Sequence, residues 1–201
     1  MAQRRHQYER AFEAYLRARK IPYVAVNEAK KAILPDGTPF RVAGDNGTQT
    51  LKSFDFVVYG STTNLLVEIK GRRLGATPSR AGTSARLESW VTLDDVESLK
   101  LWQQFFGFGF EAALVFVYQC ELQPPDGLFQ EVFEHAGKWF MLRAIYLNAY
   151  VEHMRTRSPR WRTVHLSASD FERCSQPFGP SLVGAGSDAG PEVPAFEPLS
   201  V

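Results

Sequence analysis

The sequence predicts a single α/β domain in which helices flank a mixed central β-sheet. Three features of the 201 residues support this fold class. Apolar residues recur with helical spacing in residues 3–20, alternate with polar residues in residues 53–70, and run without a break through residues 112–119. The last pattern is typical of a strand that is buried on both faces. Along the chain, these segments predict the element order α-β-β-β-α-β.

The N-terminal segment, residues 3–20, is expected to be an amphipathic helix. Its apolar stripe has the spacing i, i+4, i+7, i+8 and consists of Tyr8, Phe12, Tyr15 and Leu16. Pro22 ends the helix, because the residue before a proline avoids the helical region. Residues 22–27 then predict a strand, and the turn signals in residues 34–50 predict a short hairpin.

The segment after the two central strands, residues 71–89, is rich in Gly, Ser and Arg, and we expect a surface loop there. A helix begins near residue 93, where Thr92 and Asp95 fit an N-terminal cap. The later elements are expected to be strands at residues 112–119, 138–147 and 162–167 and a helix near residues 148–157. The domain is predicted to span residues 1–176, and the Pro/Gly/Ser-rich residues 177–201 to form a disordered tail.

The composition is that of a globular protein, with 44% hydrophobic and 22% charged residues. No apolar run reaches the roughly 18 residues that span a bilayer, so we expect no membrane partner. Cys120 and Cys174 have no metal-binding spacing, which favours reduced thiols and a cytoplasmic location. Charge is uneven, because residues 1–86 hold 15 Lys/Arg and 7 Asp/Glu, whereas residues 87–201 hold 8 and 15. The basic half could face a phosphate backbone, or the two halves could form separate solvated faces.

Three charged residues interrupt the two apolar central strands. Side chains alternate between the faces of a strand, so Glu68 and Lys70 share one face of the second strand. The sequence allows two registers between the strands. A four-residue turn at residues 60–63 places Asp55 opposite Glu68, whereas a four-residue turn at residues 61–64 places Asp55 opposite Lys70. Either register gathers all three charged groups on one face of the sheet.

These residue types fit a metal site. Two neighbouring carboxylates repel each other, and a divalent cation between them removes that penalty. Mg²⁺ prefers oxygen ligands, which Asp55, Glu68 and the backbone carbonyl of Ile69 can supply. Lys70 would then orient a water molecule or stabilise charge on a phosphate, as in metal-assisted phosphodiester hydrolysis. The alternative is a surface hairpin in which Glu68 and Lys70 form an ion pair of little value for stability.

The spacing of these residues resembles the PD-(D/E)XK nuclease superfamily. Asp55 is followed, after twelve residues, by the sequence Glu68-Ile69-Lys70 within an apolar strand. The proline of the superfamily name is missing, because Phe54 precedes Asp55.

The first helix carries a second part of the resemblance. The segment YERAFEAYLRARKIPYVAV is similar to the opening helix of archaeal-type Holliday-junction resolvases, and the match places Glu9 at the metal site. The same segment resembles the uncharacterised HYExAFE family, with Gln7 in place of the histidine of that motif. Together the two likenesses cover about residues 5–120.

The resemblance implies a restriction-endonuclease-like core and an endonuclease that uses Mg²⁺ or Mn²⁺ to hydrolyse DNA, with branched or damaged DNA in repair or recombination among the substrates. It also implies nucleic acid as the partner and, because related resolvases work as dimers, a homodimer as one assembly. The implied roles are metal binding by Asp55, Glu68, the Ile69 carbonyl and Glu9, positioning of the nucleophile by Lys70, and phosphate contacts by Arg72 and Arg73.

Two other functions stay open at this point. One is a catalytically inactive module of the nuclease fold that binds nucleic acid or a protein partner, and the other is a structural protein with a buried salt bridge. Weaker candidates for the site are Glu13, Glu28, Gln103 and Gln104. A further group interleaves basic residues with an aromatic one, and we expect it to be a solvated helix end rather than a nucleic-acid groove: Arg155, Arg157, Arg160, Trp161 and Arg162.

Overall fold

The structure is a computed structural model that describes residues 2–27, 40–44, 47–74, 87–121, 132–179 and 182. Its elements follow the chain in this order: α1 (Ala2–Ala18), β1 (Tyr23–Ala25), β2 (Phe40–Gly44), β3 (Gly47–Leu51), β4 (Phe56–Val58), β5 (Asn64–Arg73), β6 (Val91–Thr92), α3 (Leu93–Phe106), β7 (Phe110–Cys120), β8 (Val132–His135), β9 (Lys138–Tyr146), α4 (Leu147–His153), β10 (Arg155–Ser158), β11 (Thr163–His165), α5 (Ala168–Cys174) and β12 (Gln176–Pro177). No helix in this described part of the chain is long and apolar enough to cross a membrane.

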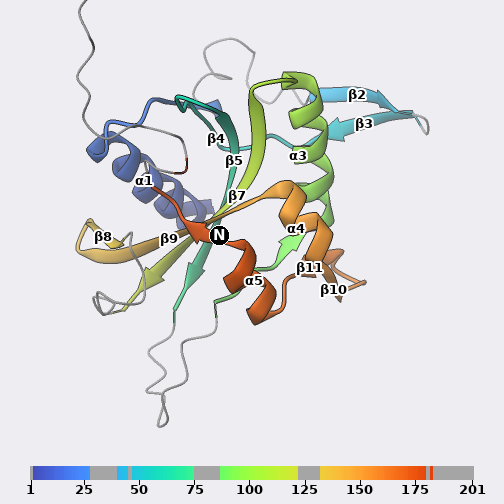
Figure 1. Ribbon diagram of the computed structural model, residues 1–201. Coiled ribbons are helices and arrows are strands. Elements are labelled where there is room, and N and C mark those ends of the chain that lie inside the picture. Colours follow the sequence, from blue (N-terminus) through green and yellow to red (C-terminus); the bar gives the residue numbers. More distant parts are fainter. Residues whose placement is uncertain are drawn as a thin grey trace, which may run out of the picture.

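A mixed sheet forms the centre of the molecule, with the strand order β1-β4-β5-β7-β9-β12 and with β8 paired to β9. The strands β5 and β7 run parallel, and their described neighbours in this sheet pair antiparallel. Helix α1 covers one face, and α3, α4 and α5 cover the other (Figure 1). Apart from the β2–β3 hairpin and the short β6, the order is α1-β1-β4-β5-α3-β7. The predicted fold class and the α-β-β-β-α-β order are therefore confirmed.

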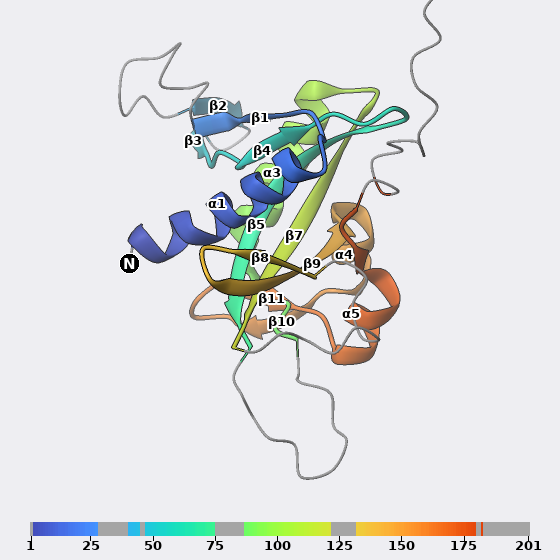
Figure 2. The ribbon, with the colours of Figure 1, turned by 90° about the vertical axis from the view of Figure 1, so that its left-hand side faces the viewer.

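Helix α1 lies across the sheet and packs over β5 (Figure 2). The predicted apolar stripe is the buried side of the helix: Tyr8, Phe12, Tyr15 and Leu16. The helix comes close because β5 has no side chain at Gly71, where a Cβ would lie 2.0 Å from Cδ2 of Tyr8. The fit of the Tyr8 ring over Gly71 thus fixes the height of α1 above the sheet.

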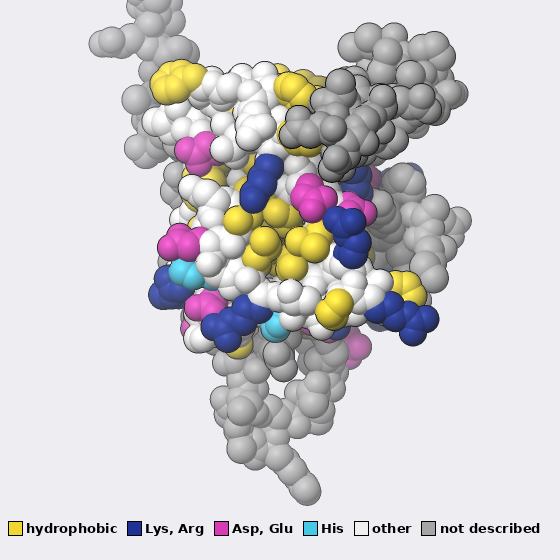
Figure 3. All heavy atoms as spheres, turned by 90° about the vertical axis from the view of Figure 1, so that its right-hand side faces the viewer, with side chains coloured by type: hydrophobic (Ala, Val, Ile, Leu, Met, Phe, Trp, Pro, Cys, Tyr) yellow, Lys and Arg dark blue, Asp and Glu magenta, His cyan; other side chains and the backbone are white. Residues whose placement is uncertain are grey.

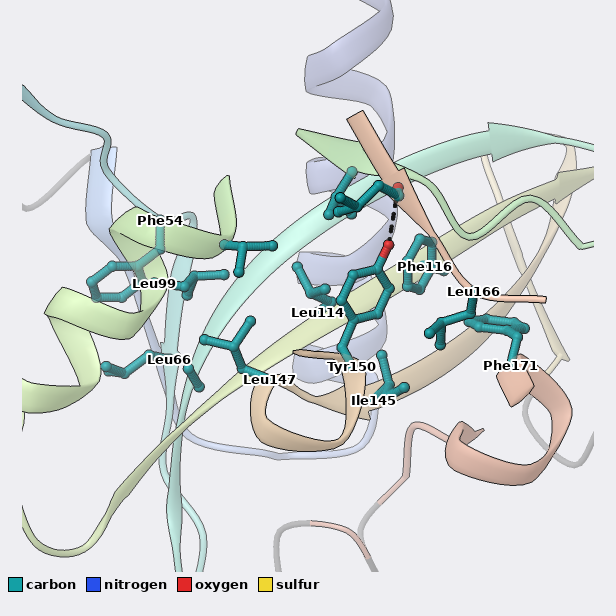
Figure 4. Packing of buried hydrophobic residues seen from close by; sticks show 14 of the residues in the cluster. Phe54, Leu66, Leu99, Leu114, Phe116, Ile145, Leu147, Tyr150, Leu166 and Phe171 are labelled. Atoms are coloured by element: carbon teal, nitrogen blue, oxygen red, sulfur yellow. Dashed lines mark hydrogen bonds between the residues drawn. The ribbon is translucent and has the colours of Figure 1, made fainter. Parts of the chain in front are cut away.

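The opposite face of the sheet is covered by a second apolar layer (Figure 4). It joins Leu66 of β5 and Leu114 of β7 to Leu99 of α3. Tyr150 of α4 is fully buried in this layer, and its hydroxyl donates to the carbonyl of Ser89 at 2.7 Å. This bond ties the segment that leads into α3 to α4, so α3 has a fixed position over β5.

Helix α3 begins where the cap was predicted. The Asp95 N–H donates to the Thr92 hydroxyl at 3.2 Å, and the Thr92 N–H donates to the Asp95 carboxylate at 3.1 Å. This reciprocal pair is a capping box, which satisfies two N–H groups that the helix itself cannot. Gly107 ends the helix with a φ of 72°, a conformation that glycine adopts without strain.

Several expected boundaries differ from the observed ones. Strand β5 reaches Arg73, inside the stretch expected to be a loop, because its parallel pairing with β7 continues to Gln119. Residues 75–86 of that expected loop lie outside the described residues. The predicted hairpin is present as β2 and β3. Five short elements had no expectation of their own, namely β6, β8, β10, α5 and β12. The helix expected near residues 148–157 ends at His153, and β10 takes the place of its last turn.

The end of the folded part lies beyond the predicted boundary at residue 176. That boundary falls within β12, which pairs with β9. Phe178 is fully buried, its ring centroid lies 4.9 Å from that of Phe12, and its carbonyl accepts a hydrogen bond from the Tyr15 hydroxyl at 2.9 Å. The segment through Phe178 therefore belongs to the core around α1, and residues 183–201 lie outside the described residues.

Candidate active site

The register of β4 and β5 decides which residue lies opposite Asp55. Phe56 is paired with Val67, so the register of β4 and β5 is the one that, continued by one residue, places Asp55 opposite Glu68 rather than Lys70. Asp55 itself lies just before β4, and its N–H donates to the Val67 carbonyl at 2.9 Å. Of the two registers open in the sequence, the one that starts the turn at residue 60 is present. Both carboxylates are buried, with 7% of Asp55 and 2% of Glu68 exposed. Carboxylates are rarely buried unless they are paired or bind a metal, so this pair needs a chemical reason.

The backbone of β5 holds the Asp55 carboxylate in place. The Ile69 N–H donates to Oδ2 of Asp55 at 2.7 Å. The N–H and C=O groups of one strand residue point to the same side of the strand, so the Ile69 carbonyl faces the same side as Asp55, beyond the end of β4. This placement fits the expected ligand role of the Ile69 carbonyl, which stays a prediction.

Lys70 connects two buried carboxylates. Its Nζ donates to Oε1 of Glu68 at 2.8 Å and to Oδ2 of Asp95 at 2.6 Å. Burial lowers the pKa of Lys70 to about 8, although the neighbouring Glu68 carboxylate acts in the opposite direction. An ammonium with this pKa can give up or accept a proton close to neutral pH.

Two residues at this site were not expected from the sequence. Lys52, between β3 and β4, forms a short ion pair with Oδ1 of Asp95 and lies 3.7 Å from Oε1 of Glu68. Helix α3 fixes the backbone of Lys52, since the Lys52 N–H donates to the Ser98 hydroxyl and the Trp102 indole N–H donates to the Lys52 carbonyl at 2.8 Å. Lys52 belongs to no apolar or polar repeat in the sequence that would indicate a role, and the sequence predicts only a helix cap for Asp95.

We call the five side chains of Lys52, Asp55, Glu68, Lys70 and Asp95 the charged cluster. Three carboxylates and two ammonium groups leave one net negative charge. The two halves of the chain, which carry net charges of opposite sign, meet in this cluster. Both lysines come from the basic half, residues 1–86, and Asp95 comes from the acidic half, residues 87–201. Three buried carboxylates close together attract cations, since burial strengthens electrostatic interactions.

The donor atoms of the charged cluster fit Mg²⁺ or Mn²⁺ in kind, because carboxylate and carbonyl oxygens are the ligands that such hard cations prefer. The contact between Lys70 and Oε1 of Glu68 sets a condition on binding. A cation at Glu68 would have to use the other carboxylate oxygen or take the place of the ammonium group.

Glu9 lies apart from Asp55 and Glu68. It is half-buried on α1, and α1 packs on the face of β5 to which Ile69 and Gly71 point, opposite to the face of Glu68 and Lys70. Among the described residues, no three His, Cys, Asp or Glu side chains are grouped so that they could hold one metal ion. The structure thus does not gather Glu9 with the two strand carboxylates, and its metal role stays a prediction.

Arg72 and Arg73, the expected phosphate contacts, differ in their surroundings. The Arg72 guanidinium lies over the Trp90 ring, 4.2 Å from the centroid, and donates to the carbonyls of Trp90 and Gly71. Its side chain is 11% exposed, so these contacts leave little of it for a phosphate. Arg73 is exposed at the end of β5.

Three of the weaker candidates are described, and none has a hydrogen bond or ion pair with the charged cluster among the contacts of the described residues. Glu13 pairs with Arg17 at 2.6 Å and accepts a hydrogen bond from the Tyr23 hydroxyl, as expected for a helix neighbour on the surface. Gln103 accepts the Ala112 N–H at 2.7 Å and so supports the start of β7, whereas Gln104 is exposed. Glu28 lies outside the described residues.

The basic segment around β10 and β11 is exposed to solvent, as expected, but it is a strand and a turn rather than the expected helix end. Trp161 is 70% exposed, and the Arg160 guanidinium lies over its ring. Arg162 pairs with Asp94 and Glu97 of α3. On the face that Figure 3 shows, Lys and Arg side chains alternate with Asp and Glu around a small apolar area. This mixture of signs does not form one basic surface.

Comparisons with known proteins add little to this geometry. No family model matches the chain, and no curated protein matches it. Among solved structures, the chain is similar to Archaeoglobus fulgidus Hjc, a Holliday junction resolvase from an archaeal hyperthermophile, with 14% identity and a TM-score of 0.47 over 89% of this chain and 94% of that one. A likeness this weak carries no weight for the chemistry of the site, which rests on its own residues.

Proposed function

We propose that this protein is a metal-dependent nuclease that hydrolyses phosphodiester bonds of DNA. One observation carries the proposal: two buried carboxylates are held at β5, Asp55 by the Ile69 N–H and Glu68 by the Lys70 ammonium. A buried lysine whose pKa is lowered by burial, as that of Lys70 is, and that contacts a buried carboxylate is more common at functional sites than elsewhere.

Each residue has a distinct task in this proposal. Asp55, Glu68 and the Ile69 carbonyl would hold Mg²⁺ or Mn²⁺. When bound, such an ion stabilises the charge on a phosphate and makes a water molecule more acidic. Lys70 orients the attacking water with its Nζ and, because its pKa is about 8, can exchange a proton there near neutral pH.

The finer points of the proposal rest on the sequence resemblance. Glu9 would support a second ion or a ligand water, after a movement that brings it toward the strand carboxylates. Arg73, which is exposed, is the better placed of the two arginines for a substrate phosphate. Branched or damaged DNA is the proposed substrate class, a homodimer would match the two cleavable strands of a junction, and a cytoplasmic location stays a prediction.

The second candidate function is a module of the same fold that binds nucleic acid or a protein without cleaving anything. The observation that favours it is the closed pairing of Lys70 with Glu68 and Asp95, which satisfies these groups without a metal. In that case the charged cluster would be a buried salt-bridge network.

A cleavage assay separates the two functions. Labelled linear duplex, single-stranded, nicked and four-way-junction DNA are incubated with the protein and with Mg²⁺, Mn²⁺ or EDTA. We expect cleavage of at least one form that needs the metal and is lost in Lys70→Ala. Equal results for the wild type and Lys70→Ala would leave only the binding module.

A further inference from the structure

Asp95 has two separate sets of partners. Through the capping box it fixes the first turn of α3, and through its two oxygens it meets two lysines, Lys70 at Oδ2 and Lys52 at Oδ1. The residue is 3% exposed. A helix cap needs only one of these sets of contacts, so the cap does not explain why the same carboxylate binds both lysines.

Lys70 and a divalent cation compete for Glu68. Both are positive, and Lys70 already lies 2.8 Å from Oε1 of Glu68. If the carboxylate of Glu68 turns to a cation, the Lys70 ammonium still has its contact with Asp95 at 2.6 Å. Lys52, the other lysine within 4 Å of Glu68, is also paired with Asp95. Asp95 is therefore a second partner, besides Glu68, for both ammonium groups.

Asp95 is well fixed for such a task. The N-terminus of a helix carries a partial positive charge, so a carboxylate in the first turn is favoured there. The capping box with Thr92 adds two hydrogen bonds that hold the Asp95 backbone and side chain. A rigid carboxylate can hold a flexible lysine at one position, whereas a mobile one would follow the lysine.

We propose that Asp95 is a positioning residue of the active site, which holds Lys70 beside the substrate when Glu68 binds a divalent cation. This inference rests on the proposed nuclease function and adds a residue to it. Lys52 is held by the same carboxylate, and its side chain is 37% exposed against 11% for Lys70, so it faces the solvent side of the charged cluster.

Two variants separate this role from helix capping. Asp95→Asn keeps the shape and an oxygen that can accept the Thr92 N–H, but it removes the charge that binds the lysines. Thr92→Ala removes the hydroxyl that accepts the Asp95 N–H and keeps the carboxylate. Both variants weaken the cap, by about 1 kcal/mol in typical helices, so a loss of thermal stability in both says nothing about positioning.

The readouts are Mn²⁺ affinity of the protein alone, measured by titration calorimetry, and the single-turnover rate on the DNA form that the wild type cleaves best. In Asp95→Asn the lysines turn to Glu68 and compete with the cation. We expect Mn²⁺ affinity and rate to fall by about 10-fold to 100-fold, the usual effect of removing a group that orients a metal ligand, with DNA affinity nearly unchanged. In Thr92→Ala, the Mn²⁺ affinity and the single-turnover rate should stay within about twofold of the wild-type values.

A crystal structure of the wild type with Mn²⁺ tests the same inference without any substitution. Nζ of Lys70 should stay on Asp95 and leave Glu68, and a Lys70 that leaves Asp95 instead would overturn the inference. Asp95→Asn values equal to those of Thr92→Ala would overturn it as well, with the nuclease function intact. A wild type that neither binds Mn²⁺ nor cleaves DNA would refute the proposed function and the inference together.

Discussion

Replacement of Lys70 should destabilise the protein far more than replacement of Glu68. Lys70→Met removes the ammonium that contacts Glu68 at 2.8 Å and Asp95 at 2.6 Å, and both carboxylates are at least 97% buried. The charged cluster would then hold three negative charges against one positive charge. Loss of one partner from a buried ion pair costs about 3–5 kcal/mol, and we expect a loss of that size in the free energy of unfolding.

Glu68→Gln changes the other partner of the contact between Lys70 and Glu68 and removes its negative charge. It leaves two carboxylates and two ammonium groups, so the charges balance, and the Gln carbonyl can still accept a hydrogen bond from Lys70. We expect a loss of about 1 kcal/mol or less without metal. Lys52→Met is the matched control for the loss of a lysine, and it should cost less than Lys70→Met because Lys52 is 37% exposed.

Urea unfolding in EDTA, followed by tryptophan fluorescence, measures these differences. The prediction is that Lys70→Met loses at least about 2 kcal/mol more than Glu68→Gln. Equal losses of several kcal/mol in both variants would refute the reasoning, because Glu68 would then be needed for a closed salt bridge rather than for binding a cation.

Two further predictions concern the packing of the core. Gly71→Ala should lower stability by about 1–3 kcal/mol in thermal unfolding, since the new methyl group would lie 2.0 Å from the Tyr8 ring. Tyr8→Leu in the Gly71→Ala background should restore part of the loss. An unchanged melting temperature in Gly71→Ala would contradict this packing. Phe178→Ala should lower the free energy of unfolding by about 3–5 kcal/mol, measured in urea, because Phe178 is fully buried against Phe12. A loss below about 1 kcal/mol would place the C-terminal segment outside the core.

Local patterns made much of the site predictable. The period of two along a strand placed Glu68 and Lys70 on one face, and the choice between two registers for Asp55 was the part that needed the structure. The Thr92–Asp95 cap was also predictable, because the contact lies within four residues of sequence.

The contacts that the sequence did not reveal are all between distant segments. Lys52 reaches Asp95 because Trp102 and Ser98 of α3 bind its backbone, and no local signal reports such packing. Arg72 has the charge expected of a phosphate ligand, but it lies against Trp90, which is 18 residues further along the chain. Phe178 is an apolar anchor in a segment whose overall composition indicates a tail.

The measurement that tests the central claim most directly is the effect of a divalent cation on thermal unfolding. A cation that binds only the folded protein stabilises it by about 2.7 kcal/mol at a concentration 100 times the dissociation constant. We predict that Mn²⁺ or Mg²⁺ raises the melting temperature of the wild type, and that Glu68→Gln removes this rise while Glu13→Gln, at the surface of α1, retains it. A wild type whose melting temperature does not respond to either ion, or a Glu68→Gln variant that responds as the wild type does, would contradict a metal site at Asp55 and Glu68.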